Sequence, residues 1–225
     1  MFLKVADVAA LVGVDEKIVL DWIRHQGLHA YKQDDRYHIN RVDLLEWATG
    51  KGIVIPPDVF AAREELLLLP TVSAALRQGG IHYDLPGDTP ETALREVVNR
   101  LKLPPGLDPE FLLQTLLARE ALGSTAFGNG IAIPHVRNPI VGQTDESAIS
   151  LCFLKNPIDF NAIDGQPVTI LFTFVTPNVK AHLHLLAQLA FLLHHRSFQT
   201  LLHRPGTEVE ILSAVRTLEE TIVRR

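Results

Sequence analysis

The chain has 225 residues, of which 47% are hydrophobic, which is enough apolar material for the cores of one large or two modest domains. Its formal charge of −5 at pH 7 gives no global electrostatic reason to bind nucleic acid or an anionic membrane. A single cysteine, Cys152, lies in an apolar alternation, and no export signal or membrane-length apolar stretch is evident, so we expect a cytoplasmic protein without membrane insertion.

Residues 1–50 predict a small helical module. The apolar residues of its first helix recur at helical spacing up to Gly13, which is placed to end that helix. Asp15 is placed to cap a second helix, which Gly27 closes. Asn40 then begins a third helix, so the module has three helices.

Two short extended pieces, residues 28–32 and 36–39, lie between the second and third helices and are joined by the Asp34-Asp35 turn. The order helix, tight turn, helix, small hairpin and helix resembles the excisionase or MerR-like winged helix-turn-helix family. Three stretches carry the resemblance: 5–14, 19–24 and 37–47. It implies that the second helix enters the major groove of DNA and that the hairpin, or wing, contacts phosphates.

The charges of this module leave two interpretations open. Residues 1–50 hold six Lys or Arg and eight Asp or Glu, a net charge of −2, and a net negative surface neutralises DNA phosphates poorly. Asp34 and Asp35 at the wing tip would also repel phosphates. Either the module binds DNA, or the fold serves protein interaction or dimerisation. The candidates for DNA contact are Arg24, Lys32, Arg36 and Arg41.

The Gly50-Lys51-Gly52 stretch and the pair Pro56-Pro57 mark a boundary, so we interpret residues 51–70 as a linker that contains a helix over 58–69. Its run of four leucines, 66–69, is too short to span a bilayer. We expect this helix to pack on a domain or on a second subunit, and the latter would make a homodimer.

Residues 71–225 predict an α/β domain with a mixed sheet and flanking helices. Thr89 and Pro90 are typical of a helix start, and a later helix carries Arg119 near its end. The remaining predicted elements are strands over 149–153 and 168–175, a long helix through Leu193 and a final helix over 209–218.

The run 128–135, Gly-Asn-Gly-Ile-Ala-Ile-Pro-His, is the most informative stretch for chemistry, because a short apolar strand delivers His135 beside a glycine-rich turn. Pro134 has a fixed φ and pushes Ile133 toward extended geometry, so the backbone that holds the imidazole is stiff. Glycines at 128 and 130 let main-chain N–H groups approach an anion. On spacing alone, a histidine after a strand is more often a surface or core residue.

Residues 119–125 followed by 128–135 resemble the active-site block of the mannitol/fructose-type and nitrogen-regulatory (PtsN-like) EIIA domains of the bacterial phosphotransferase system. The similarity continues through 157–160, 162–168 and 182–187 and covers roughly residues 71–225. It implies a histidine phosphotransferase: His135 accepts a phosphoryl group from an HPr-like donor and passes it to an EIIB-like or regulatory acceptor. The family usually has Gly after this histidine. Val136 stands here, and a β-branched residue resists φ > 0, so we expect a differently placed loop and an altered transfer rate.

The resemblance also assigns roles to two partners. Arg119 matches the active-site arginine of the family, and its planar guanidinium can hold two phosphate oxygens. His182 matches the second histidine and falls in the first turn of a helix that Thr176 or Asn178 could cap, near the positive end of the helix dipole. The candidates for positioning the phosphate are Gly128, Asn129, Gly130, Ser124 and Thr125.

The other histidines are given structural interpretations. His184 lies about 200° around the helix from His182, so both rings cannot point into one pocket. His194, His195 and His203 lack carboxylates at ligand spacing, so we predict neither a metal nor another cofactor.

The leading hypothesis is a nitrogen-regulatory EIIA-type phosphocarrier fused to a helix-turn-helix module, with a regulatory output. Two alternatives stay open: a transcription regulator or adaptor that uses the EIIA-like domain for binding only, and a sugar-specific EIIA transport component.

Overall fold

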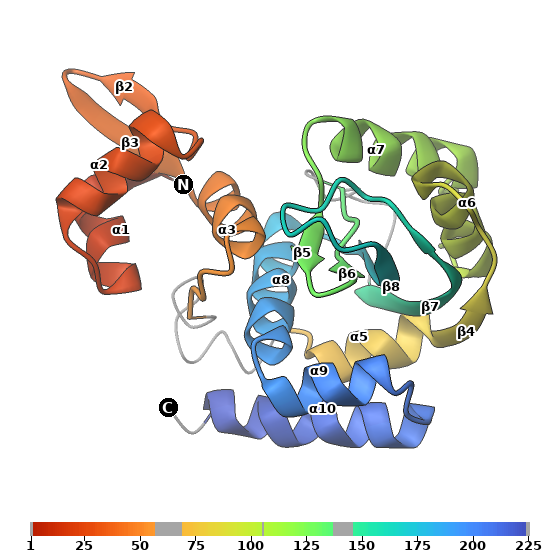
Figure 1. Cartoon of the computed structure of the whole chain (residues 1–225). Coiled ribbons are helices and arrows are strands. Elements are labelled where there is room, and N and C mark those ends of the chain that lie inside the picture. Colours follow the sequence, from red (N-terminus) through yellow and green to blue (C-terminus); the bar gives the residue numbers. More distant parts are fainter. Residues whose placement is uncertain (1, 57–68, 105, 137–145, 224–225) are drawn as a thin grey trace.

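A computed structural model of the protein describes residues 2–56, 69–104, 106–136 and 146–223 (Figure 1). The helix expected at 58–69 falls almost entirely on residues outside these ranges. The described residues form a small N-terminal module and a larger α/β domain, so the fold class expected from the sequence is confirmed.

The N-terminal module contains helices α1 (Val5–Val12), α2 (Glu16–His25) and α3 (Arg41–Gly50). Gly13 ends α1 with φ 71°, a left-handed conformation that glycine adopts without steric cost. The side chain of Asp15 accepts a hydrogen bond from the Lys17 N–H at the start of α2. Asn40 caps α3 in the same way. Both predicted caps are therefore confirmed.

A three-stranded antiparallel sheet completes the module, with the strands β1 (Phe2–Lys4), β3 (Arg36–Asn40) and β2 (Tyr31–Gln33) in that order. Asp34 and Asp35 form the two-residue wing turn with φ of 48° and 59°, the backbone that a tight hairpin requires. The first hairpin strand begins later than expected because Leu28 turns inward: its N–H donates to the Trp22 carbonyl and its side chain is 2% exposed.

The larger domain is built on a five-stranded mixed sheet in the order β4-β7-β8-β6-β5. Two neighbouring pairs are parallel, β4 with β7 and β6 with β8. The other two pairs, β7 with β8 and β5 with β6, are antiparallel. The strands are β4 (Ile81–Leu85), β5 (Ala126–Gly128), β6 (Ile131–Ala132), β7 (Ala148–Ile158) and β8 (Val168–Val175).

Helices cover both faces of this sheet. Along β8, Phe172 and Phe174 face one hydrophobic cluster, whereas Leu171 and Val175 face the other, as the alternation of a buried strand requires. Figure 1 shows α6 and α7 on one side and α5, α8, α9 and α10 on the other. The helices are α5 (Val72–Gly79), α6 (Pro90–Arg100), α7 (Pro109–Ala121), α8 (Val179–Leu193), α9 (Arg196–His203) and α10 (Glu208–Val223).

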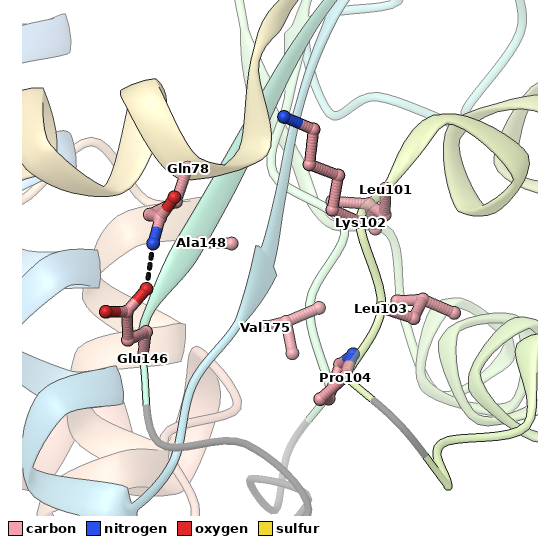
Figure 2. Close-up of a pocket in the computed structure, with 8 residues that line it drawn as sticks. All are labelled: Gln78, Leu101, Lys102, Leu103, Pro104, Glu146, Ala148 and Val175. Atoms are coloured by element: carbon pink, nitrogen blue, oxygen red, sulfur yellow. Dashed lines mark hydrogen bonds between the residues drawn. The ribbon is translucent and has the colours of Figure 1, made fainter.

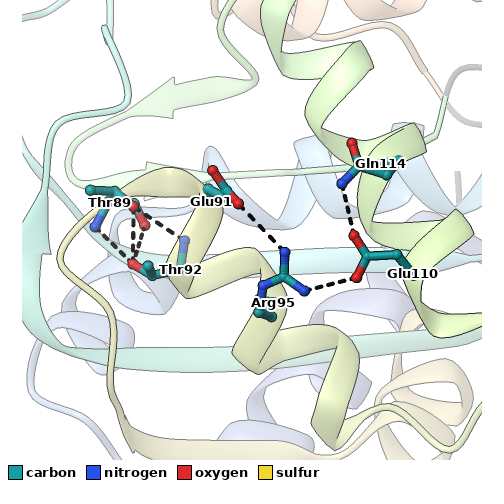
Figure 3. Close-up of polar contacts among 6 residues, drawn as sticks. All are labelled: Thr89, Glu91, Thr92, Arg95, Glu110 and Gln114. Carbon is teal, nitrogen blue, oxygen red and sulfur yellow. Dashed lines mark hydrogen bonds and ion pairs between the residues drawn. The ribbon is translucent and has the colours of Figure 1, made fainter.

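The start of α6 follows the sequence prediction, and the middle of the helix makes ion pairs with α7 and within α6. Thr89 accepts a hydrogen bond from the Thr92 N–H, with Pro90 at the first helical position (Figure 3). Farther along, Arg95 pairs with Glu110 of α7 at 2.8 Å and with Glu91 at 3.5 Å. These contacts are exposed and stabilise weakly, so the buried apolar stripe, not the ion pairs, holds the two helices together.

Candidate functional site

His135 lies just after β6 and forms a single parallel bridge with Phe174 of β8, so the sheet fixes its backbone. Its Nδ1 lies 2.6 Å from the Ile133 carbonyl oxygen. A carbonyl oxygen can only accept, so Nδ1 donates and carries a proton. In the neutral ring Nε2 then keeps its lone pair. The residue is 4% exposed. The geometry therefore presents Nε2 as the atom with nucleophilic character.

His182 reaches the same place from the first turns of α8. Asn178 caps that helix by accepting from the Ala181 N–H at 2.9 Å, and the ring centroid of His182 lies 5.3 Å from that of His135. Among the described residues, neither ring nitrogen of His182 has a hydrogen-bond partner. Burial lowers the pKa of His182 to about 3, and the positive charge of Arg119 acts in the same direction. The ring is thus neutral near pH 7.

Arg119 completes the group from the last turn of α7. Its Nη1 donates to the Gly123 carbonyl at 2.9 Å, which orients the guanidinium. Its Nη2 lies 3.2 Å from Glu46 Oε2, and Glu46 Oε1 lies 3.6 Å from His135 Nε2. The structure therefore brings Arg119, His135 and His182 together, and one carboxylate connects the first two.

Glu46 was not among the residues expected at the site. It belongs to α3 of the N-terminal module, and its side chain is 10% exposed. Nothing in the local sequence marks this glutamate, because a surface carboxylate on a helix is the ordinary interpretation. Only the docking of the two modules, in which α3 contacts α8 and β5, brings it to His135.

The predicted phosphate-positioning residues have different surroundings. Ser124 lines the same cavity as Arg119 and Glu46, whereas the hydroxyl and the N–H of Thr125 donate to Glu120. The Gly128-Asn129-Gly130 turn is at the other end of the β5–β6 hairpin from His135. Its central N–H donates to Asp164 at 2.7 Å. The structure does not bring this turn to the imidazole, because the turn instead contacts the Asp164 loop.

A cavity of about 310 Å³ lies where the two modules meet, next to this group of residues. Arg119 and Ser124 line it from the α/β domain, and Glu46 and Trp47 line it from α3. At the rim, Leu122 and Ile163 are 74% and 76% exposed. The site is thus a polar cavity with an apolar rim.

A second concavity, on another part of the α/β domain, contains none of the predicted site residues (Figure 2). Gln78 and Glu146 in its wall are hydrogen bonded to each other. Lys102 is the one cation among the eight lining residues. None of the eight lining residues is a histidine, and none belongs to the predicted site, so the cavity beside Arg119 is the candidate site.

The four candidate DNA contacts are spread over the module. Arg24 is exposed in the last turn of α2, and Arg36 is exposed at the start of β3. Lys32 pairs with Asp35 across the wing turn at 2.8 Å, which offsets its charge. Arg41 is half-buried at the first position of α3. Of these four residues, only Arg24 and Arg36 have an exposed guanidinium group that is not in an ion pair like that of Lys32.

Two of the other histidines, His184 and His194, lie in structural surroundings. His184 is buried, which lowers its pKa to about 4. His194 places its two ring nitrogens 2.7 Å from the Ala190 carbonyl and 2.9 Å from the Gly52 carbonyl. Within the described ranges, no three His, Cys, Asp or Glu side chains gather as a metal site. None of the helices described there has the length and apolar character needed to cross a membrane.

Fold and site together define a mixed-sheet α/β domain that presents a histidine beside a second histidine and an arginine, with a winged helix-turn-helix module attached. The family model described as "Phosphoenolpyruvate-dependent sugar phosphotransferase system, EIIA 2" matches residues 75–217. A model described as "Helix-turn-helix domain" matches residues 2–52. The chain therefore belongs to the EIIA 2 family of the sugar phosphotransferase system.

Individual relatives agree with this assignment. The nitrogen regulatory protein of Pseudomonas aeruginosa is 38% identical over 121 residues, which cover 52% of this chain and 77% of that protein. The nitrogen regulatory protein of Escherichia coli is 35% identical over 121 residues, covering 51% of this chain and 71% of that protein. The crystal structure of nitrogen regulatory protein IIA-Ntr from Neisseria meningitidis superposes with a TM-score of 0.55 at 26% identity, over 67% of this chain and 97% of that one. The sequence interpretation as a nitrogen-regulatory EIIA relative with an added helix-turn-helix domain is confirmed.

Proposed function

We propose that this chain is a histidine phosphocarrier that accepts a phosphoryl group on Nε2 of His135 and serves a regulatory output. The observation that carries the proposal is the arrangement around that atom. Nδ1 of His135 is held by the Ile133 carbonyl at 2.6 Å, which leaves Nε2 on the side of Glu46 and Arg119, with the ring of His182 5.3 Å away.

Each neighbour has a distinct role in this mechanism. Phosphoryl transfer needs positioning and positive groups for the charge on the equatorial oxygens more than it needs covalent help from the protein. The guanidinium of Arg119 can hold two oxygens at once. His182 is neutral, and its buried nitrogens lack partners among the described residues, so one ring N–H is available to a phosphoryl oxygen.

The valine after the histidine does not work against this role. The backbone φ of Val136 is not positive. The side chain is 1% exposed and packs in the same hydrophobic cluster as Leu171 and Val175. The backbone here does not need the freedom of glycine. A buried valine stiffens the segment behind His135, which favours a fixed direction of attack.

The donor in this proposal is an HPr-like phosphohistidine protein in the cytoplasm, and the acceptor is an EIIB-like or a regulatory protein. The apolar rim at Leu122 and Ile163 supports a protein partner, because large exposed apolar side chains beside a polar cavity are typical of docking surfaces. Both relatives are named nitrogen regulatory proteins, which favours regulation over sugar transport as the output.

The test is phosphorylation in vitro with phosphoenolpyruvate, Enzyme I and HPr. The full chain should acquire acid-labile phosphate, and His135→Ala should acquire none. His184→Ala serves as the control, because His184 is likewise a buried histidine but lies about 200° around α8 from His182. If both the wild-type chain and its Glu46→Gln variant stayed unlabelled, the phosphocarrier would be refuted and the binding-only adaptor would remain.

The helix-turn-helix family match favours a second activity, sequence-specific DNA binding by α2 and the wing. The exposed guanidinium groups of Arg24 and Arg36 would contact the DNA. A salt-dependent shift of promoter fragments that weakens in Arg24→Ala and Arg36→Ala, but not in the half-buried Arg41→Ala, would support groove binding. The absence of binding to any genomic fragment at low salt would favour a protein-interaction module.

A further inference from the structure

The carboxylate of Glu46 occupies the space in front of the phosphate-accepting atom. One oxygen lies 3.6 Å from Nε2 of His135 and the other 3.2 Å from Nη2 of Arg119. The side chains of all three residues are 13% exposed or less. The carboxylate lies between an imidazole nitrogen and a guanidinium and places two anionic oxygens where phosphoryl oxygens would lie, so the helix-turn-helix module presents an anion to a site suited to a phosphoryl group.

The module is held there by more than one contact. Helix α3 packs on α8 and β5, and it lies between the rest of its module and the α/β domain (Figure 1). After α3, the Gly52 carbonyl lies 2.9 Å from Nε2 of His194, whose Nδ1 contacts the Ala190 carbonyl. The docked arrangement therefore has an ion pair at one end and a hydrogen bond at the other.

From these contacts we infer that the helix-turn-helix module is an internal inhibitor of the phosphate-accepting site, with Glu46 as the group that occupies it, and that phosphorylation of His135 releases the module. The inference rests on the proposed function of His135. Its steric part follows from burial: His135 is 4% exposed, so a donor protein cannot bring its phosphohistidine in line with Nε2 while α3 is docked.

The electrostatic part of the inference follows from the charge of phosphorylated His135. Nε2 of His135 forms a bond to phosphorus as the P–N bond of the donor breaks. The donor imidazole leaves with the proton on its other nitrogen, and His135 keeps its Nδ1 proton. The phosphoryl group brings a charge of about −1.5 to −2 to this place at neutral pH. The ring behind it, with Nδ1 protonated and Nε2 bonded to phosphorus, is a cation. The phosphoryl group takes the place of the Glu46 carboxylate beside Arg119, and two anions cannot share that place, so phosphorylation and docking exclude each other.

The first experiment measures the initial rate of His135 phosphorylation by HPr and Enzyme I in the full chain. Glu46→Gln and Glu46→Ala should each raise the rate at least about fivefold, the lower end of typical coupling between sites. Glu16→Gln, the same change at an exposed position of α2, should leave it unchanged. Equal rates in wild type and both Glu46 variants would overturn the inference and leave the phosphocarrier intact.

The second experiment needs no phosphate donor. Fluorophores are placed on Lys17→Cys in α2 and Ala118→Cys in α7, both exposed, while the native Cys152 is fully buried. His135→Asp, which adds an anion, should shift the energy-transfer efficiency toward an open state relative to the neutral His135→Asn. This difference should disappear in the Glu46→Gln background. Equal efficiencies for Asp and Asn would refute displacement by charge, even if no variant were ever phosphorylated.

Discussion

His182 should make the stability of the α/β domain depend on pH in a defined window. Burial, first of all, lowers its pKa from an ordinary 6.5 to about 3. The folded state therefore binds fewer protons at this ring than the unfolded chain between those two values. Where the unfolded state binds more protons, stability rises with pH. The stability that neutral His182 contributes is thus complete above about pH 6.5 and is lost as the pH falls.

The size of the effect follows from the same linkage. Each pH unit below the unfolded pKa costs about 1.4 kcal/mol per such group. Acidification from pH 7 to 5 therefore removes about 2 kcal/mol of unfolding free energy through His182. His184, whose pKa burial lowers to about 4, acts in the same direction. The carboxylates add their own pH dependence, so the His182→Gln variant, not the wild-type curve alone, isolates this contribution.

The assay is urea unfolding at pH 7, 6 and 5, followed by far-UV circular dichroism. Fluorescence would report on the wrong part of the chain, because both tryptophans, Trp22 and Trp47, belong to the N-terminal module. The loss between pH 7 and 5 should be about 2 kcal/mol smaller in His182→Gln than in wild type. His195→Gln, at the junction of α8 and α9, is the matched control for the loss of a histidine outside the site. An unchanged slope in His182→Gln would refute the assignment of a neutral buried ring.

Three further outcomes follow from the fold. Burial raises the pKa of Cys152 to about 11, so a thiol reagent at pH 8 should modify the native chain at least about 100-fold more slowly than the urea-unfolded chain. Asn178→Ala removes the cap on Ala181 and should cost about 1 kcal/mol in denaturant unfolding. Gly79→Ala would place a Cβ 2.3 Å from the Ile149 carbonyl oxygen, so α5 must shift and a loss of about 1–3 kcal/mol in the same assay is expected. Rapid labelling of Cys152 in the native chain would contradict the first prediction. Unchanged unfolding midpoints in Asn178→Ala or Gly79→Ala would contradict the other two.

The elements that the sequence predicts well are those with local signals. Asp15, Asn40 and Thr89 each cap a helix within three residues of themselves, and a cap needs no knowledge of the rest of the fold. Strand β8 is found with its observed bounds because its run of apolar residues is buried on both faces.

The elements that the sequence does not predict depend on distant partners. Strand β4 has polar residues at His82 and Asp84 and exists because it pairs with β7 at the sheet edge. Strand β1 has three residues and exists through its pairing with β3. The same holds for the site. His135, Arg119 and His182 belong to one domain and to one family motif, whereas Glu46 joins them only through domain docking, for which no sequence signal was present.

Docking of a helix-turn-helix module over a phosphorylation site couples two binding events by necessity. If only the undocked arrangement accepts a phosphoryl group, any ligand that prefers the undocked module must raise the extent of phosphorylation, and phosphorylation must tighten that ligand by the same factor. In the docked arrangement α2 and the wing keep Arg24 and Arg36 exposed, so DNA that contacts these residues alone would bind both arrangements equally and would shift nothing. A DNA effect on phosphorylation would therefore require contact with α3 itself. Measuring the phosphorylation rate of wild type and Arg24→Ala with and without bound DNA distinguishes the two cases.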